Sequence, residues 1–415
     1  MSEHSSTPET LAFVLPRYFA GIAGGAETLV SALAQRLAMR GQSVEILTTC
    51  ARDNRSWRNE LAVGDSHEDG ILVRRFPVDD RDLERWIPLQ IRISEGLHLT
   101  IDEQLDWMQH SVNSTALYAQ IARNRGSYRA LFFGPYLFGT TFWGSQIVPD
   151  RSILIPCLHD EAYAYLDVTA AMFRGVRGCM FNAMFEGELA RSIYGDLLGG
   201  EVGMGFDPPA ASALRALTPY FEDRAPYLLY LGRKETGKNA QLLVDHFIAL
   251  KTRAPESGIK LVVVGGGSFD DLHRPGVLER GDIIDLHHVS EVDKQRLIRH
   301  ALVLCQPSTN ESFSIVLMEA WMLGTPVLVH ANCAVTRHHV VSSGGGLYFS
   351  DSDDFIAAVL ELSTNQVLRQ RLVVAGDRYV RNRYSWSAVL QRFDEVLAKI
   401  EGHSADAKLS PGVGL

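Results

Sequence analysis

Three things are scarce in this 415-residue sequence, and each scarcity excludes a class of protein. Lysine is absent before Lys234, so the first half of the chain is basic only through arginine, and the formal net charge is -9. Proteins that bind nucleic acids usually carry a basic excess, so nucleic acid is not an expected partner. No apolar run approaches the ~20 residues that span a bilayer. Residues 1–10 are polar and acidic, unlike a secretory signal.

Cysteine is also scarce, and its placement argues against metal or disulfide chemistry. The five cysteines are scattered, and none forms a C-x-x-C pair: Cys50, Cys157, Cys179, Cys305 and Cys333. Isolated buried thiols in a reducing compartment are the better interpretation. We therefore expect a cytoplasmic protein without zinc, and no metal ligand set is assigned.

What is present is a repeated alternation of short apolar strands and helical stretches. Residues 11–15 have the length of a buried strand, residues 26–37 repeat apolar positions at helical spacing, and residues 44–48 form the next strand. This pattern predicts an α/β protein with parallel sheets covered on both faces. A strand is expected at residues 71–76 and a single helix around residues 105–123, while the rest of residues 51–129 shows no recognisable motif.

A second alternation follows a Gly/Pro/Ala-rich stretch at residues 199–226, which we interpret as an interdomain linker. We therefore predict two doubly wound, Rossmann-like domains, at residues 1–205 and 206–385. Residues 386–401 are expected to form a C-terminal helix, and residues 402–415 a disordered tail. Ligands of open α/β sheets bind at the carboxyl ends of the strands, so the expected site is a cleft between two such edges.

The segment at residues 311–319 is the strongest candidate site. A predicted strand leads into a polar loop and then a helix, whose N-terminus offers unpaired N–H groups and a positive dipole end to a phosphate. Ser312 and Ser314 suit helix capping. Glu311 faces whatever lies at the helix N-terminus, and Glu319 suits hydrogen bonds to vicinal hydroxyls. The alternative is a capped helix with solvated glutamates.

Two further loops carry residues suited to a diphosphate. Arg233 and Lys238 follow a strand, where two cations could stabilise the growing charge of a departing diphosphate, although such residues are often plain surface. Gly24 and Gly25 occupy the first strand-to-helix turn, where glycine allows close approach of a phosphate. Residues 265–268 lack the G-x-G-x-x-G spacing and are interpreted as a turn.

Several histidines and carboxylates are weaker candidates. His159 follows a predicted strand, where it could contact a sugar hydroxyl or be an ordinary loop histidine. The adjacent histidine pairs at 287–288 and 338–339 point apart and lack a carboxylate partner, so they are not assigned to metal. Two D-x-D sequences, at residues 80–82 and 351–353, lie in solvated loops and are rejected as cation sites.

Taken together, these motifs resemble glycosyltransferase family 4 (glycosyl transferases group 1), which are retaining enzymes of the GT-B fold. The matching features span residues 11–40 and 227–400, and they end with the Gly-Thr-Pro-Val and Tyr-Ser-Trp sequences at 324–327 and 384–386. The resemblance departs at Ser312 and Ser314, where many relatives have glycine. It departs again after residue 329, where the usual glycine pair and glutamate are missing.

The resemblance implies roles for the candidate residues. Arg233 and Lys238 would bind the diphosphate of a nucleotide-sugar donor, together with amides of the Gly24–Gly25 turn and of the helix start. Glu311 and His159 would contact the transferred sugar, Glu319 the ribose and the backbone near Val289 the base. Family members are thought to use a front-face displacement that needs no protein nucleophile and no metal. The helix-start amides are those of the residues Phe313, Ser314 and Ile315.

The resemblance implies transfer of a hexose-type sugar to a saccharide or lipid-linked acceptor in polysaccharide or glycoconjugate synthesis. No cofactor is expected beyond the nucleotide-sugar co-substrate, and a peripheral membrane contact would involve the N-terminal domain. Two alternatives stay open, a nucleotide-sugar 2-epimerase of the same fold and a noncatalytic sugar-nucleotide-binding subunit. A nicotinamide dehydrogenase lacks the required loop spacing.

Overall fold

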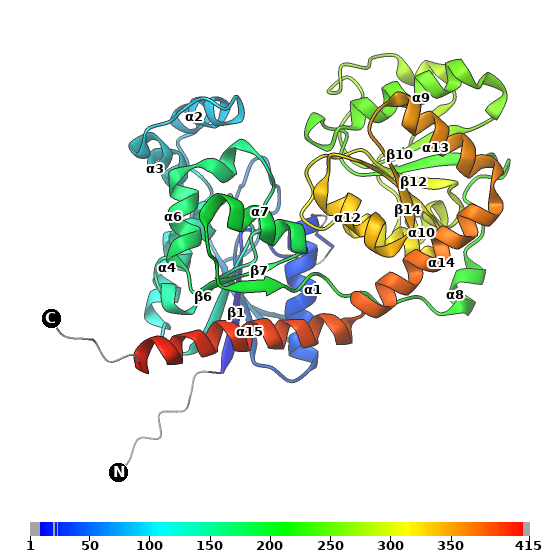
Figure 1. The fold of residues 1–415 in the computed structure, drawn as a ribbon. Coiled ribbons are helices and arrows are strands. Elements are labelled where there is room, and N and C mark those ends of the chain that lie inside the picture. Colours follow the sequence, from blue (N-terminus) through cyan, green and yellow to red (C-terminus); the bar gives the residue numbers. More distant parts are fainter. Residues whose placement is uncertain (1–8, 20, 23, 410–415) are drawn as a thin grey trace, which may run out of the picture. The chain divides into compact units, whose positions relative to one another are not determined.

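The computed structural model describes residues 9–19, 21–22 and 24–409, with side chains up to residue 403. The chain forms two compact units. Unit 1 contains residues 1–205 and 389–415, and unit 2 contains residues 206–388. Each unit is an α/β body with its own sheet, and helices flank each sheet (Figure 1).

Unit 1 is built on an eight-stranded sheet with the order β3-β4-β2-β1-β5-β6-β7-β8. Its strands pair in parallel except for the β3–β4 hairpin at one edge. The central strand β1 is fully buried along residues 11–15, which explains its uninterrupted apolar sequence. The strands are β1 (Thr10–Leu15), β2 (Val44–Thr49), β3 (Gly64–Glu68), β4 (Ile71–Phe76), β5 (Tyr128–Phe133), β6 (Ser152–Leu154), β7 (Gly178–Phe181) and β8 (Gly199–Glu201).

The helices of unit 1 cover both faces of this sheet. Figure 1 shows α4 and α6 on one side of the strands and α1 on the other. They are α1 (Gly25–Met39), α2 (Leu83–Ser94), α3 (Ile101–Gln109), α4 (Thr115–Arg123), α5 (Gly139–Ser145), α6 (Asp167–Gly175) and α7 (Met184–Tyr194).

Two expectations for unit 1 were wrong. The single helix expected at residues 105–123 is two helices, α3 and α4, because Ser114 caps a new helix start by accepting the N–H of Leu117. The expected linker includes a strand, since β8 pairs in parallel with β7. Gly199 is needed there for close approach, because a Cβ at its φ of 141° would lie 1.8 Å from the carbonyl oxygen of Cys179.

Unit 2 is built on a six-stranded, all-parallel sheet with the order β11-β10-β9-β12-β13-β14. Its strands are β9 (Tyr227–Leu231), β10 (Lys260–Val264), β11 (Ile283–Asp285), β12 (Val303–Gln306), β13 (Val327–His330) and β14 (Gly346–Phe349). Its helices are α8 (Ala211–Ala216), α9 (Ala240–Arg253), α10 (Glu291–His300), α11 (Ile315–Leu323), α12 (Ala334–Ser343), α13 (Ser352–Thr364) and α14 (Gln366–Arg383).

The last helix, α15 (Trp386–Leu409), begins in unit 2 and continues into unit 1 from Val389. Within unit 1 it is fastened by ion pairs from Arg40 to Asp394 and from Arg129 to Glu401, at 2.7 and 2.8 Å. The helix passes the Gly402 position at which a disordered tail was expected to begin. Alanine and lysine in residues 405–408 favour helix, which outweighs the single glycine. Residues 410–415 of that tail lie outside the described residues.

Candidate functional site

The candidate donor residues of unit 2 gather at the carboxyl edge of its sheet. Strands β9 and β12 are parallel neighbours, with Leu228 opposite Val303, so the loops that follow them leave the sheet side by side. Lys238, from the loop after β9, places its Nζ 2.8 Å from Oε1 of Glu311, from the loop after β12. The structure thus joins two residues that lie 73 positions apart in the sequence.

The Lys238–Glu311 pair is partly shielded from water. The lysine side chain is 26% exposed and the glutamate 11%. A second bond joins the same two loops, since the Asn239 side-chain amide donates to the carbonyl of Pro307 over 3.2 Å. The pair is therefore held in place by its loops and still accessible to a ligand.

The start of α11 has an unusual backbone. Ser314 is the N-cap residue and is left-handed, with φ 68° and ψ 75°. The expected side-chain capping by Ser314 is not found, because N-cap side chains reach back to helix amides from extended backbone, not from the left-handed region. The Leu317 N–H already donates to the Ser314 carbonyl over 3.2 Å, but the amides before it have no carbonyl one turn back in the helix, so this uncapped N-terminus can still bind an anion.

Ser312 and Ile315, on either side of this turn, are half-buried, whereas Phe313 lies beneath it. The Phe313 ring is 2% exposed and packs edge-on against Tyr384 and His339, with centroids 5.1 and 5.5 Å apart. Burial lowers the pKa of His339 to about 3, so this histidine is neutral at physiological pH. The neutral His339 ring can stay buried against Phe313, and this packing supports the turn at the start of α11 from the protein interior.

Glu319 lies one turn further along α11 and pairs with a residue that sequence reasoning missed. Its Oε1 is 2.9 Å from Nζ of Lys294 on α10, which also pairs with Glu291 at 2.9 Å. Burial raises the pKa of Glu319, and the Lys294 charge opposes that rise. Lys294 is one charged residue of a charged helix, and no motif in the sequence could have marked it.

Arg233 does not join the Lys238–Glu311 pair. Its side chain is 62% exposed and lies 3.0 Å from Glu235. The next residue, Lys234, is the buried one: its ammonium donates to the carbonyl of Gly265 and lies 3.1 Å from Asp285. Lys234 thus links the loop after β9 to the loop after β10 and to the last residue of β11.

The three glycines at residues 265–267 serve this loop packing. Gly265 has φ 138°, and a Cβ there would lie 2.0 Å from the carbonyl oxygen of Gly232. Val289, half-buried, lies in the loop between β11 and α10, at the same carboxyl edge of the sheet as the other donor candidates. It directly precedes Ser290, the N-cap of α10.

In unit 1, Gly24 and Gly25 lie at the start of α1, as predicted for a strand-to-helix turn. Gly24 is the N-cap and makes no side-chain bond, and a Cβ on Gly25 would meet nothing within 4 Å. Beside them, Glu27 in the first turn pairs with Arg17 at 2.6 Å, and both side chains are largely buried. A Cβ on Gly24 would lie 2.2 Å from Oε2 of Glu27, so the Glu27 carboxylate lies against this turn and only the Gly25 side of it is open.

His159 follows β6, at the carboxyl edge of the unit 1 sheet. Its Nδ1 is 3.7 Å from Oε1 of Glu161, which also accepts a hydrogen bond from the Tyr136 hydroxyl over 2.8 Å. The preceding residue is anchored by a buried carboxylate: Glu186 on α7 accepts the N–H of Leu158 over 2.7 Å. Burial raises the pKa of Glu186 to about 8, and its backbone donors oppose the rise. Sequence reasoning had not marked Glu186.

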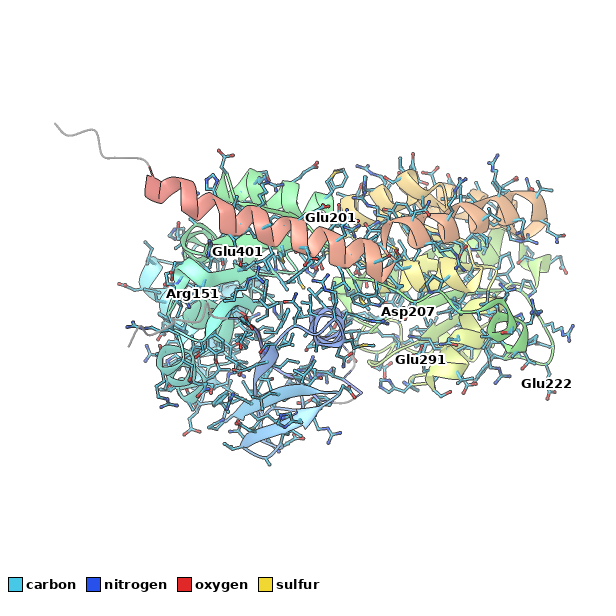
Figure 2. The ribbon with its side chains drawn as sticks, turned by 90° about the horizontal axis from the view of Figure 1, so that it is seen from below. Arg151, Glu201, Asp207, Glu222, Glu291 and Glu401 are labelled. Carbon is cyan, nitrogen blue, oxygen red and sulfur yellow. The ribbon has the colours of Figure 1, made fainter. Side chains whose placement is uncertain are left out.

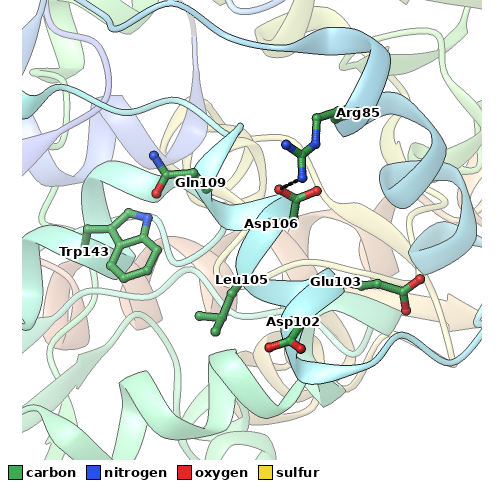
Figure 3. Close-up of a pocket in the computed structure, with 7 residues that line it drawn as sticks. All are labelled: Arg85, Asp102, Glu103, Leu105, Asp106, Gln109 and Trp143. Atoms are coloured by element: carbon green, nitrogen blue, oxygen red, sulfur yellow. Dashed lines mark ion pairs between the residues drawn. The ribbon is translucent and has the colours of Figure 1, made fainter.

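A pocket of about 470 Å³ lies elsewhere on unit 1, beside α3 and Trp143 of α5 (Figure 3). Arg85 pairs with Asp106 across it at 2.7 Å, and Glu103 pairs outside it with Arg92 at 2.6 Å. Because its principal charges already have partners, we give this pocket no role in the chemistry.

Among the described residues, no group of three or more His, Cys, Asp or Glu side chains is placed to hold a metal ion. Nor does any helix in the described part of the chain combine the length and apolar character needed to cross a membrane.

Comparison with known proteins now bears on this site. Residues 219–378 match the sequence model of the family described as Glycosyl transferases group 1. The phosphatidyl-myo-inositol mannosyltransferase of Mycobacterium tuberculosis (strain CDC 1551 / Oshkosh) is 30% identical over 257 residues, which cover 59% of this chain and 67% of that protein. The matched family region contains Arg233, Lys238, Glu311 and Glu319.

Solved structures share the whole fold at low identity. The sucrose-phosphate synthase of Thermosynechococcus elongatus superposes with a TM-score of 0.71 at 16% identity, covering 95% of this chain and 100% of that one. HepE of Anabaena, solved with UDP and glucose, gives a TM-score of 0.67 at 14% identity, covering 94% and 99%. These matches establish the GT-B fold. With the family match and the mannosyltransferase relative, they show that the chain is a glycosyltransferase and belongs to the glycosyl transferases group 1 family, glycosyltransferase family 4.

Proposed function

We propose that this protein is a retaining glycosyltransferase that moves a hexose from a nucleotide-diphosphate sugar to an acceptor hydroxyl. The observation that carries the proposal is the Lys238–Glu311 pair beside the uncapped N-terminus of α11. A cation, a carboxylate and free helix amides at one point suit a ligand that joins a diphosphate to a sugar.

The donor would be held by groups with distinct tasks. Lys238 and the amides of Phe313, Ser314 and Ile315 would bind the diphosphate, and Arg233 would swing in from its exposed position. Glu319, held by Lys294, would accept hydrogen bonds from the ribose hydroxyls. The backbone near Val289 would meet the base.

The transfer itself would follow a front-face displacement. The acceptor oxygen forms a bond to the anomeric carbon while the bond to the diphosphate breaks, and the acceptor proton passes to the leaving phosphate oxygen. Lys238 and the α11 dipole then stabilise the charge that grows on the diphosphate, without a metal ion. Glu311 and His159 would hold sugar hydroxyls, and the amides at Gly24 and Gly25 would supply further donors.

The acceptor is proposed to be a saccharide or lipid-linked saccharide in polysaccharide or glycoconjugate synthesis. The mannosyltransferase relative supports a hexose such as mannose, and the neighbour solved with UDP and glucose supports a glucose donor as the competing choice. We place the reaction in the cytoplasm, at the inner face of the membrane.

A peripheral membrane contact is supported by α2. Leu83, Ile87 and Ile91 repeat every fourth residue, and 46–49% of each is exposed. Arg85 lies beside them with 59% of its side chain exposed but is paired with Asp106 at 2.7 Å, so the apolar face of the helix carries this part of the proposal. Binding to anionic vesicles should fall in Ile87→Glu and persist in Val367→Glu, which alters an exposed valine of unit 2. If the wild-type protein, Ile87→Glu and Val367→Glu bind the vesicles equally, the membrane contact through α2 is wrong.

The central test is a thermal-shift panel of UDP, GDP, ADP and their hexose conjugates, with EDTA and then with added magnesium, followed by turnover assays. We expect one nucleotide class to stabilise the protein equally with and without metal. Lys238→Ala and Glu319→Ala should lose that shift, whereas Lys251→Ala, near the opposite end of α9, should keep it. If no nucleotide raises the melting temperature of the wild-type protein, the donor assignment is wrong.

A further inference from the structure

A second polar cavity lies at the opposite edge of the unit 1 sheet from His159. It has a volume of about 770 Å³ and opens where the parallel strands begin. Arg129 is the second residue of β5, Arg151 directly precedes β6, and Arg177 directly precedes β7. Three neighbouring strands therefore each bring a guanidinium to this cavity. Ser43, directly before β2, lines its far side.

Glu401 of α15 is the anion already present. It accepts two hydrogen bonds from Arg129, both of 2.8 Å, in the side-by-side geometry that suits a guanidinium and a carboxylate. Figure 2 shows Arg151 and Glu401 on the same side of unit 1, next to α15. The charge of Arg129 is therefore compensated within the chain.

Arg151 and Arg177 are placed differently. Arg151 donates to the carbonyls of Arg125 and Tyr128, at 2.8 and 2.7 Å. Arg177 donates to the carbonyls of Asp150, Ile400 and Glu401, at 2.9–3.2 Å. Among the described residues, neither guanidinium forms an ion pair with a carboxylate, although both are half-buried. Carbonyl groups orient these cations but do not neutralise them, and the cavity offers two carboxylates, Glu9 and Glu401, for three arginines, so it is one negative charge short.

We propose that this cavity binds a phosphate-bearing anion between Arg151 and Arg177. A guanidinium presents several N–H donors in a plane, and its remaining donors match two oxygens of one phosphate group. The Ser43 hydroxyl lines the same cavity and shares a hydrogen bond of 3.0 Å with the Thr10 hydroxyl; with Thr10 as the donor of that bond, Ser43 can donate to the anion. The three arginines of the cavity face two carboxylates, Glu9 and Glu401, so the net charge of the cavity is one positive charge. This charge suits one small anion better than a polyanion.

This site is separate from the donor site proposed above, because it lies at the amino-terminal edge of the unit 1 sheet, whereas His159, Gly24 and Gly25 follow the carboxyl ends of strands in that sheet. The phosphate could arrive as a free ion or as the headgroup of a lipid, and the two sources share the same chemistry. Only a headgroup would bring a membrane surface to the cavity, so comparison of inorganic phosphate with vesicles separates them.

The test is calorimetric titration of the full chain with inorganic phosphate at constant ionic strength. Arg151→Gln and Arg177→Gln should each weaken binding by about tenfold, the loss expected for one charge-assisted interaction. Arg215→Gln, which removes an exposed arginine from α8 of unit 2, should leave the affinity unchanged. Lys238→Gln should also keep this binding, which separates it from phosphate bound at the donor site.

Vesicles containing phosphatidylglycerol, compared with phosphatidylcholine vesicles, form the second arm. Binding that needs Arg151 and Arg177 but not Ile87 would identify the lipid headgroup as the source. Because both arginines also hold backbone carbonyls, a variant could fail to fold. Protection of Arg151 and Arg177 from phenylglyoxal by phosphate, followed in the wild-type protein by peptide mass spectrometry, covers that case. Absence of protection, or equal weakening in Arg215→Gln, would overturn the proposal.

Discussion

The pair between Lys238 and Glu311 leads to an expectation that separates binding from catalysis. The lysine is engaged by the carboxylate, with 2.8 Å between Nζ and Oε1. A diphosphate that uses Lys238 must compete with Glu311, and the carboxylate also repels it. Glu311→Gln keeps the shape of the side chain and removes its charge, so it should tighten binding of the nucleoside diphosphate while slowing sugar transfer.

The size of each effect follows from the geometry. A hydrogen bond between charged groups contributes about 1.5–3 kcal/mol, and an exposed ion pair contributes about 1 kcal/mol or less. The pair lies between these limits, because the side chains are 26% and 11% exposed. A release of about 1 kcal/mol corresponds to roughly fivefold tighter binding. Loss of a carboxylate that holds a sugar hydroxyl should lower kcat by about tenfold to a hundredfold.

Calorimetry with the nucleoside diphosphate selected by the thermal-shift panel would measure the first effect, and turnover of the sugar nucleotide the second. Lys238→Met should weaken both, and Glu256→Gln, which alters an exposed residue in the short Pro255–Ser257 helix between α9 and β10, should change neither. If Glu311→Gln weakens diphosphate binding, then Glu311 is a direct support of the phosphate site and the competition argument is wrong.

Three further predictions concern the surroundings of the site. Ser314→Gly should raise the free energy of unfolding by up to about 1 kcal/mol in urea titrations without loss of nucleotide affinity, because the serine is left-handed and its buried hydroxyl has no partner among the described residues. Lys294→Met removes the charge that opposes the raised pKa of Glu319, so more of this carboxylate is protonated at mildly acidic pH; calorimetry should show a larger loss of nucleotide affinity from pH 8 to pH 6 than in the wild type. Glu186→Leu leaves the buried backbone N–H groups of the loop before His159 unpaired and should cost about 3 kcal/mol of unfolding free energy, whereas the same change at exposed Glu188 should cost under about 0.5 kcal/mol.

The elements of unit 2 were predictable because buried parallel strands and loop glycines leave strong local signals. The strand at Tyr227–Leu231 is an uninterrupted apolar run, and the helix at Ile315–Leu323 follows the polar loop that the sequence predicts before it. The meeting of Lys238 with Glu311 also follows, once β9 and β12 are known to be neighbours. The order of the strands depends on packing across the whole sheet, so it cannot be predicted from any local stretch of sequence.

Residues 51–129 show why unit 1 was harder. Strand β3 carries exposed, polar residues and is defined by its antiparallel pairing with β4, so it has no apolar alternation to detect. The break between α3 and α4 depends on Ser111 and Asn113, whose side chains bond to nearby backbone instead of continuing a helix. Side-chain bonds to backbone of this kind can be recognised only when the position of the bonded backbone is known.

The proposed donor edge of unit 2 has no surplus of positive charge, and this limits how it can hold a diphosphate. Glu311 is matched by Lys238, while Lys294 is shared by Glu319 and Glu291, so these two lysines face three carboxylates. The negative charge of a diphosphate must then be met by the amides of α11 and by a cation outside the two pairs. Arg233 is suited to this, because its pairing with Glu235 is exposed and such pairs contribute little, so the guanidinium can exchange partners at small cost. The exposed position of Arg233 therefore favours a side chain that moves to the donor over a merely structural role.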